Sequence, residues 1–313
     1  MKALEVILGK VEDDVAKVLE KNPPVEDVDP DDLDADGLPD AQNESWFRID
    51  ELVVVFADLQ NSTQLGTGKH AASTAAIYRA ATGNAVQVMH EFEANFIQIQ
   101  GDGAFGLFWG RRALERAMCA GITVKTFSEK ALVPKLKSRW DGDPDTGFKV
   151  GMGSGRVLVK NVGTPRNENE QEPIWAGKPV NYAAKAAQQA TRHQLIVTGS
   201  VWDAIKNNDY LTVSCGHGTS GGSGPSGLWE DVEITKLTHD TDEAKGRLLK
   251  TCWCDSCGPG FAAAILRGET DRDDAGPVRA AATAFSSRLF EEAARRREER
   301  TLARKRGLSV RKR

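Results

Sequence analysis

The chain has 313 residues and a mass of 34.0 kDa, 40% of its residues are hydrophobic, and its net charge is −4. A chain of this length and composition builds a globular core without disulfide bonds, which excludes disordered and fibrous classes. No stretch holds the roughly 18 apolar residues that a membrane-spanning helix needs, and the amino terminus lacks a cleavage site. We therefore predict a cytoplasmic protein that makes no membrane contact.

Cysteine number and charge exclude two further classes. The five cysteines are an odd set, which indicates reduced thiols or a metal site rather than a secreted disulfide framework. The acidic balance argues against a general nucleic-acid binder, because such proteins carry an excess of positive charge for the phosphate backbone.

Hydrophobic spacing and composition divide the chain into segments, taken here in order. Residues 1–22 predict an amphipathic helix, and the Asp- and Pro-rich residues 23–47 predict an acidic linker. Residues 48–215 alternate strand-like and helical patterns, which predicts one domain. A Gly/Ser-rich insertion and a cysteine cluster follow at 216–260, and a basic helical tail follows at 261–313.

The domain is expected to hold several strands and three helices. The strand-like runs are residues 52–59, 96–100, 104–109, 148–154, 156–162 and 195–199, and the helical runs are 70–91, 113–133 and 180–190. We expect Gly153–Gly155 to form a turn between two of these strands, and residues 174–177 to form a turn into the last helix.

Two aspartates are expected where strands end. Asp58 follows an apolar run, and Asp102 lies at the tip of a predicted hairpin over residues 100–103. Carboxylates in such positions bind Mg²⁺ or Mn²⁺, and the amides of the turn after Asp58 suit phosphate oxygens. Taken singly, each aspartate is more often a turn residue that accepts hydrogen bonds from nearby amides.

Asn181 and Lys185 lie four residues apart on one face of the last predicted helix. An amide and an ammonium group side by side suit a ribose and a developing phosphoryl charge. A helix cap and a solvated lysine are the alternative interpretation.

Four motifs in this order resemble the class III nucleotide cyclase catalytic domain over residues 48–215. They are FADLQNST at 56–63, QGDGAFGLF at 100–108, GMGSGRVLVKNVG at 151–163 and WAGKPVNYAAK at 175–185. FADLQNST and VNYAAK most resemble the bacterial pyrimidine cyclases of Pycsar anti-phage defence. The resemblance implies an α+β fold with a ferredoxin-like βαββαβ core, a homodimer with shared active sites, and an effector gated by the cyclic nucleotide.

The resemblance also implies roles for single residues. Asp58, Asp102 and the backbone carbonyl of Leu59 match the ligands of two divalent cations, Mn²⁺ or Mg²⁺. Asn181 matches the residue that orients the ribose, and Lys185 replaces the transition-state arginine, which keeps the charge but loses the bidentate fork. The amides expected to bind the leaving phosphates belong to Gln60, Asn61, Ser62 and Thr63.

The positions that select the base in purine cyclases hold Gln98 and Ile174 here. An apolar side chain cannot pair with the adenine amino group, whereas a glutamine amide suits O4 and N3–H of uracil, or cytosine after an amide flip. UTP is therefore the expected substrate and cyclic UMP with pyrophosphate the products, while CTP stays open. Phe56 either stacks on the base or packs inside the domain.

Three other functions remain open at this point. They are a purine cyclase with an unusual base pocket, a catalytically silent cyclase-like dimer that only binds ligands, and a nucleic-acid binder that uses its basic tail. Retention of both Asp58 and Asp102 argues against the silent form.

Two clusters lie outside these motifs. Cys252, Cys254 and Cys257 predict a zinc site that Cys215 or His217 completes, although the spacing matches no standard knuckle and free thiols are the alternative. Residues 32–37 repeat the first half of a calcium-binding EF-hand loop. Its twelfth position is an asparagine rather than a glutamate, so we favour an acidic tether.

Overall fold

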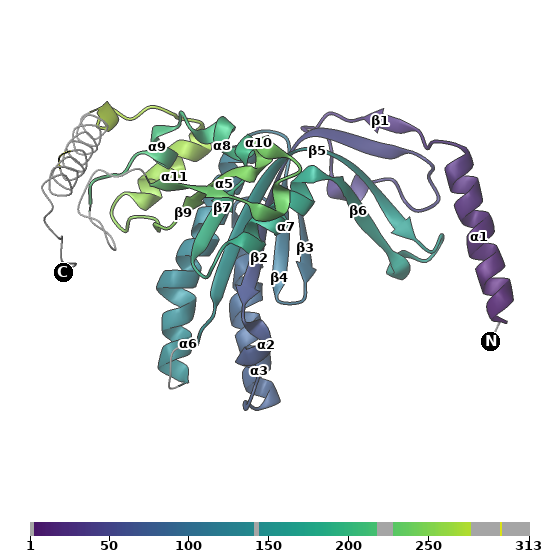
Figure 1. Cartoon of the computed structure of the whole chain (residues 1–313), viewed down its shortest axis with the longest axis horizontal. Helices are drawn as coiled ribbons and strands as arrows, with labels where there is room; N and C mark the ends of the chain where they lie inside the picture. The colour runs from purple at the N-terminus through teal and green to yellow at the C-terminus, as the bar shows by residue number, and fades with distance from the viewer. Residues whose placement is uncertain (1–2, 141–143, 218–227, 277–294, 296–313) are drawn as a thin grey trace, which may run out of the picture.

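The computed structural model describes residues 3–140, 144–217, 228–276 and 295. One central sheet has the strand order β3-β4-β2-β5-β7-β9-β8, with β1 beside β2 and β6 beside β5 (Figure 1). Its strands are β1 (Val25–Asp27), β2 (Trp46–Gln60), β3 (Phe96–Gln100), β4 (Gly103–Phe108), β5 (Gly147–Gly163), β6 (Gln171–Gly177), β7 (Gln194–Val197), β8 (Trp229–Glu233) and β9 (Lys245–Leu249).

The helices of the described residues include several short turns. They are α1 (Leu4–Glu20), η1 (Ala35–Gly37), α2 (Ser62–Leu65), α3 (Ala71–Tyr78), η2 (Arg79–Gly83), α4 (Asn84–Glu91), α5 (Ala113–Phe127), η3 (Ser128–Leu132), α6 (Val133–Arg139), η4 (Glu168–Glu170), α7 (Lys178–Gln189), α8 (Gly199–Ile205), α9 (Asp209–Thr212), η5 (Thr235–Leu237), α10 (Thr241–Ala244) and α11 (Gly258–Arg267).

The core of the sheet has the ferredoxin-like order. β2, β3, β4 and β5 are its first to fourth strands along the chain, and they lie side by side as second, third, first and fourth. Helices α3 and α4 connect the first strand to the second, and α5 and α6 connect the third to the fourth. This alternation is the split βαβ arrangement, so the predicted α+β fold with a βαββαβ core is confirmed.

Different helices cover the two faces of the sheet. Met152 of β5 and Val55 of β2 are register partners that point to the face packed against α5. Phe56 and Gly151, the adjacent pair, point to the opposite face, which α7 covers. A Cβ on Gly151 would lie 2.0 Å from the carbonyl oxygen of Ala183, so α7 rests directly on the strand.

Two predicted turns are wrong. Gly153–Gly155 lies inside β5, which continues from Gly147 to Gly163. The pairing with β2 shifts register between Ile49 and Leu52, and Gly155 has a φ of +139° at this irregularity, so the glycine bends the strand without ending it. The second turn, predicted over 174–177, belongs to β6, which pairs with β5 as a hairpin.

The predicted acidic linker lies against the sheet. β1 pairs in parallel with β2, Leu38 is buried, and the indole N–H of Trp109 donates to the carbonyl of Leu33 at 3.0 Å. Helix α1 precedes this segment and has no buried residue. Together β1 and these contacts keep the segment beside the domain rather than free of it.

Several expectations fall outside the described ranges. The Gly/Ser-rich run at 218–227 lies there, and so does most of the basic tail, namely residues 277–294 and 296–313. Among the helices that the structure does describe, none has the length and apolar character needed to cross a membrane.

Candidate active site

The two aspartates lie near the same end of the sheet. Asp58 lies on β2, directly after the last residue that pairs with β4, Ala57, and Asp102 lies in the turn between β3 and β4. The hydroxyl of Thr82 donates to the backbone carbonyl of Asp102 at 2.9 Å. Thr82 belongs to η2, a π-helical turn of the kind often found at functional sites, and it fixes the tip of the hairpin.

Asp58 has an ion-pair partner that the sequence did not indicate. Its Oδ2 lies 2.5 Å from Nζ of Lys149, its register partner on β5, and the two side chains are 26% and 18% exposed. Asp58 is therefore partly open to solvent, and a cation already stands beside its carboxylate.

The backbone of β2 directs a third oxygen toward the hairpin. The carbonyl oxygen of Ala57 lies 2.9 Å from the position of a Cβ on Gly103, so it faces β4. Carbonyls two residues apart point to the same side of a strand, which directs the carbonyl of Leu59 to the side where Asp102 lies. Asp58, Asp102 and the carbonyl of Leu59 thus lie near the same end of the sheet.

The turn after Asp58 is held in place by several contacts. Asn61 adopts a φ of 55°, and its side-chain amide donates to the carbonyl and carboxylate of Asp145 at 2.9 and 3.0 Å. The carbonyl of Gln60 accepts from the Thr146 hydroxyl at 2.6 Å. These two residues are engaged by the protein, whereas the amides of Ser62 and Thr63 lie in the first turn of α2, where helical amides lack intrahelical acceptors.

Of the residues expected to contact the base, Phe56 and Gln98 lie on the face that α7 covers. Phe56 stacks on Phe105 with ring centroids 4.0 Å apart, and Gln98 is the register partner of Phe105 on β3. The amide of Gln98 donates to the Glu172 carboxylate of β6 at 3.4 Å. Ile174, two residues further along β6, is 46% exposed. Phe56 therefore packs against a protein ring, and Glu172 is a neighbour of Gln98 that the sequence did not indicate.

Asn181 and Lys185 both lie on α7. Asn181 is exposed, and its side-chain amide donates to the carbonyl of Gly177 at 3.2 Å. The ammonium of Lys185 lies 5.5 Å from the ring centroid of Tyr182. Within the described residues, no hydrogen bond or ion pair joins either side chain to the two aspartates.

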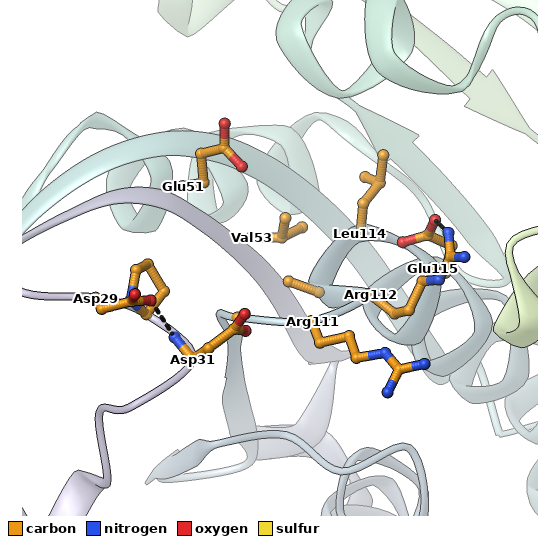
Figure 2. Close-up of a pocket in the computed structure, with 11 residues that line it drawn as sticks. Asp29, Asp31, Glu51, Val53, Arg111, Arg112, Leu114 and Glu115 are labelled. Carbon is orange, nitrogen blue, oxygen red and sulfur yellow. Dashed lines mark hydrogen bonds and ion pairs between the residues drawn. The ribbon is translucent and has the colours of Figure 1, made fainter.

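A pocket of about 590 Å³ lies elsewhere, at the start of α5 (Figure 2). Asp29, Asp31, Glu51, Arg111 and Arg112 are among the residues that line it. None of the predicted site residues does so. Asp58 instead lies on β2, which pairs with β4 on one side and β5 on the other.

The predicted zinc ligands are corrected in one respect. Cys252 lies apart from the cluster. Its thiol instead contacts Glu129 at 3.1 Å and Lys125 at 3.4 Å. Burial raises the pKa of this thiol. The donor atoms of four other residues lie together; these are Cys215, His217, Cys254 and Cys257.

The EF-hand-like aspartates bind their own backbone. Asp34 accepts from the amide of Asp36 at 3.3 Å, and Asp40 accepts from the amides of Gln42 and Asn43 at 2.8 and 2.9 Å. These contacts are turn caps that satisfy nearby backbone amides.

The chain has close curated relatives. It is 50% identical over 307 residues to a uridylate cyclase from Micromonospora echinofusca, covering 97% of this chain and 98% of that protein. It is 49% identical to a uridylate cyclase from Propioniciclava tarda, covering 88% of each chain. The chain belongs to the uridylate cyclase family. No family model matches the sequence.

Solved structures with a similar arrangement are more distant. The adenylyl cyclase CyaB from P. aeruginosa matches with a TM-score of 0.47 and 17% identity, covering 57% of this chain and 92% of that chain. A class III adenylyl cyclase-like ATP-binding protein from Pseudomonas aeruginosa matches with a TM-score of 0.49 and 17% identity, covering 66% and 43%.

Proposed function

We propose that the protein converts UTP to cyclic UMP and pyrophosphate. The observation that carries this proposal is the placement of Asp58 of β2 and Asp102 of the β3–β4 turn near the same end of the sheet. It is supported by membership of the uridylate cyclase family over 97% of the chain. In the reaction the ribose 3′-oxygen attacks the α-phosphorus, and the bond to the β-phosphate oxygen breaks.

The oxygen ligands at the strand ends fit hard divalent cations. Two carboxylates and a backbone carbonyl are ligands that Mg²⁺ and Mn²⁺ prefer, so Asp58, Asp102 and Leu59 would hold them. When bound, such ions lower the pKa of an attacking hydroxyl and neutralise phosphate charge. The chain itself supplies the rigid frame, in which Thr82 holds the hairpin tip and β5 holds β2.

Lys149 has a role in the same site. Its ammonium neutralises Asp58 in the chain without cations. With divalent cations held by that carboxylate, the Lys149 ammonium would be available to add positive charge for the substrate phosphates beside the amides of Ser62 and Thr63.

Glu172 fixes the orientation of the base-reading amide. Because Glu172 accepts from the NH₂ group of Gln98, flipping that amide would bring two acceptor oxygens together. Uracil and cytosine present reversed donor and acceptor patterns to an amide, so an amide that cannot flip prefers one of them. We infer that the orientation in which Glu172 holds the Gln98 amide is the one that pairs with uracil.

Asn181 and Lys185 act from the second protomer of a homodimer. They lie on α7, and within the described residues no hydrogen bond or ion pair joins them to the aspartates of their own chain, which supports a site completed by a partner. Asn181 orients the ribose there, and Lys185 stabilises the charge that develops on the transferring phosphoryl group.

The product suits a signalling role. A small cyclic nucleotide made in the cytoplasm can open or activate an effector, and the motif resemblance assigns the system to anti-phage defence. Extracts of phage-infected cells should contain cyclic UMP when the wild-type gene is present and lack it when the gene encodes Asp102→Ala.

The direct test is product formation from equimolar UTP, CTP, ATP and GTP with Mn²⁺, followed by mass spectrometry. Cyclic UMP should dominate for the wild type, and Asp58→Ala should give no cyclic product. Glu172→Gln should increase the cyclic CMP fraction, because a glutamine can donate or accept and so permits the flip. Cyclic AMP as the main wild-type product would contradict the uridylate assignment.

A further inference from the structure

A four-residue cluster lies far along the chain from the catalytic motifs. Cys215 and His217 follow α9, and Cys254 and Cys257 lie between β9 and α11. Their four donor atoms all lie within 4.8 Å of one another. The Nδ1 of His217 is 3.2 Å from the Cys257 sulfur.

The separations match a single tetrahedral ion. Zinc binds thiolate sulfur at about 2.3 Å and imidazole nitrogen at about 2.0 Å, which places neighbouring donors about 3.5–3.8 Å apart. Thiolates and imidazole are the ligands that zinc prefers, and four protein ligands leave no position for water or substrate. We propose that Cys215, His217, Cys254 and Cys257 bind one structural Zn²⁺.

Backbone hydrogen bonds around the cluster support this assignment. The backbone amides of Cys257 and Ser256 donate to the Cys254 sulfur. Amide hydrogen bonds of this kind compensate thiolate charge around a metal and fix the orientation of the ligands. The Cys254 carbonyl accepts from the amide of Gly258 at 2.7 Å, which starts α11 directly after the ligands.

The ion would anchor α11 to the catalytic domain. α11 packs on α5, where the thiol of Cys119 lies 3.9 Å from the carbonyl of Ala262. Its Phe261 meets Tyr210 of α9 edge-on at 5.4 Å, and the Arg272 guanidinium lies 4.3 Å from the Phe261 ring centroid. A zinc ion bound by all four residues would link the segment of Cys215 and His217 to the segment of Cys254 and Cys257, which lie far apart in the sequence.

The experiment measures metal in the full-length protein, independently of nucleotide turnover. Protein purified under reducing conditions from zinc-supplemented medium, without a chelator, is passed through gel filtration and analysed by mass spectrometry for metals. We expect about one zinc per chain for a closed four-ligand site. Cys257→Ser and Cys254→Ser should lose at least 90% of it, and Cys252→Ser, the matched control, should retain it.

Two outcomes would overturn the proposal. One is a wild-type protein that holds no stoichiometric zinc after this preparation. The other is zinc lost by Cys252→Ser and retained by Cys257→Ser. If the ligand variants aggregate, the absorption spectrum of wild-type protein exchanged with Co²⁺ tests the proposal instead. Tetrahedral thiolate ligation gives intense visible and near-ultraviolet absorption, whereas an octahedral oxygen site does not, so a spectrum without these bands would contradict the site.

Discussion

The substitution Gly151→Ala should weaken the fold and the activity together, because it acts where α7 rests on β5. The new Cβ would lie 2.0 Å from the carbonyl oxygen of Ala183 and 2.3 Å from the amide nitrogen of Ala187. Ordinary contact begins at 3.4 Å, and both neighbours are backbone atoms. α7 must therefore move away from the sheet by about 1.5 Å, since backbone within a helix cannot rotate aside as a side chain can.

The magnitude follows from this overlap. Overpacking in a dense core costs typically 1–3 kcal/mol, and a backbone clash places Gly151→Ala at about 3 kcal/mol. For a domain of this size that lowers the melting temperature by about 6–12 °C. Because α7 carries Asn181, a displacement of about 1 Å should also lower the rate of cyclisation by about 100-fold.

Thermal unfolding followed by circular dichroism and cyclic UMP formation from UTP measure the two effects. The control is Gly9→Ala in α1, where no atom lies within 4 Å of the new methyl group, and both quantities should stay near wild type. A Gly151→Ala protein with wild-type melting temperature and rate would refute the packing of α7 on β5 as the support for the site.

Three further predictions concern the base, the phosphates and pH. Gln98→Lys with Ile174→Asp should raise the cyclic AMP fraction in mixed nucleotides, because the pair restores a donor and an acceptor for adenine; an unchanged product ratio would contradict the base assignment. Lys149→Met should raise the KM for UTP and lower kcat about 10-fold with the fold intact, and unchanged kinetics would exclude a phosphate contact. Burial lowers the pKa of His193, so the unfolded chain binds its proton more readily and the free energy of unfolding falls as pH drops below the unfolded pKa of about 6.5. His193→Gln should reduce this loss in urea titrations between about pH 7.5 and 5.5, and an unchanged pH slope would contradict it.

The core strands and the aspartates could be predicted because their signals are local. The apolar run before Asp58 and the short loop around Asp102 give both strands and their ends without tertiary information. The ferredoxin-like βαββαβ core was predicted from motif resemblance rather than from periodicity. The observed strand order β3-β4-β2-β5 confirms it.

The features that the sequence did not predict depend on contacts between segments that are distant in the chain. The glycines at 153–155 carry the local signal of a turn, yet they serve close packing and a strand bend. Glu172 meets Gln98 across 74 positions, a pairing that no local pattern encodes. Cys252 shares the CxCxxC motif with two cluster members, but it lies beside the buried Lys125 because the chain passes α5 before it reaches the cluster.

The shared active site is the central claim, and subunit complementation tests it most directly. Asp102→Ala and Asn181→Ala should each be inactive as homodimers. Mixed under subunit exchange, they should regain activity, because one of the two sites in each heterodimer keeps both residues. A statistical mixture holds half heterodimers with one intact site each, which predicts about one quarter of the wild-type rate. Heterodimers demonstrated by differential tags that make no cyclic UMP would place both residues in a site built from a single chain.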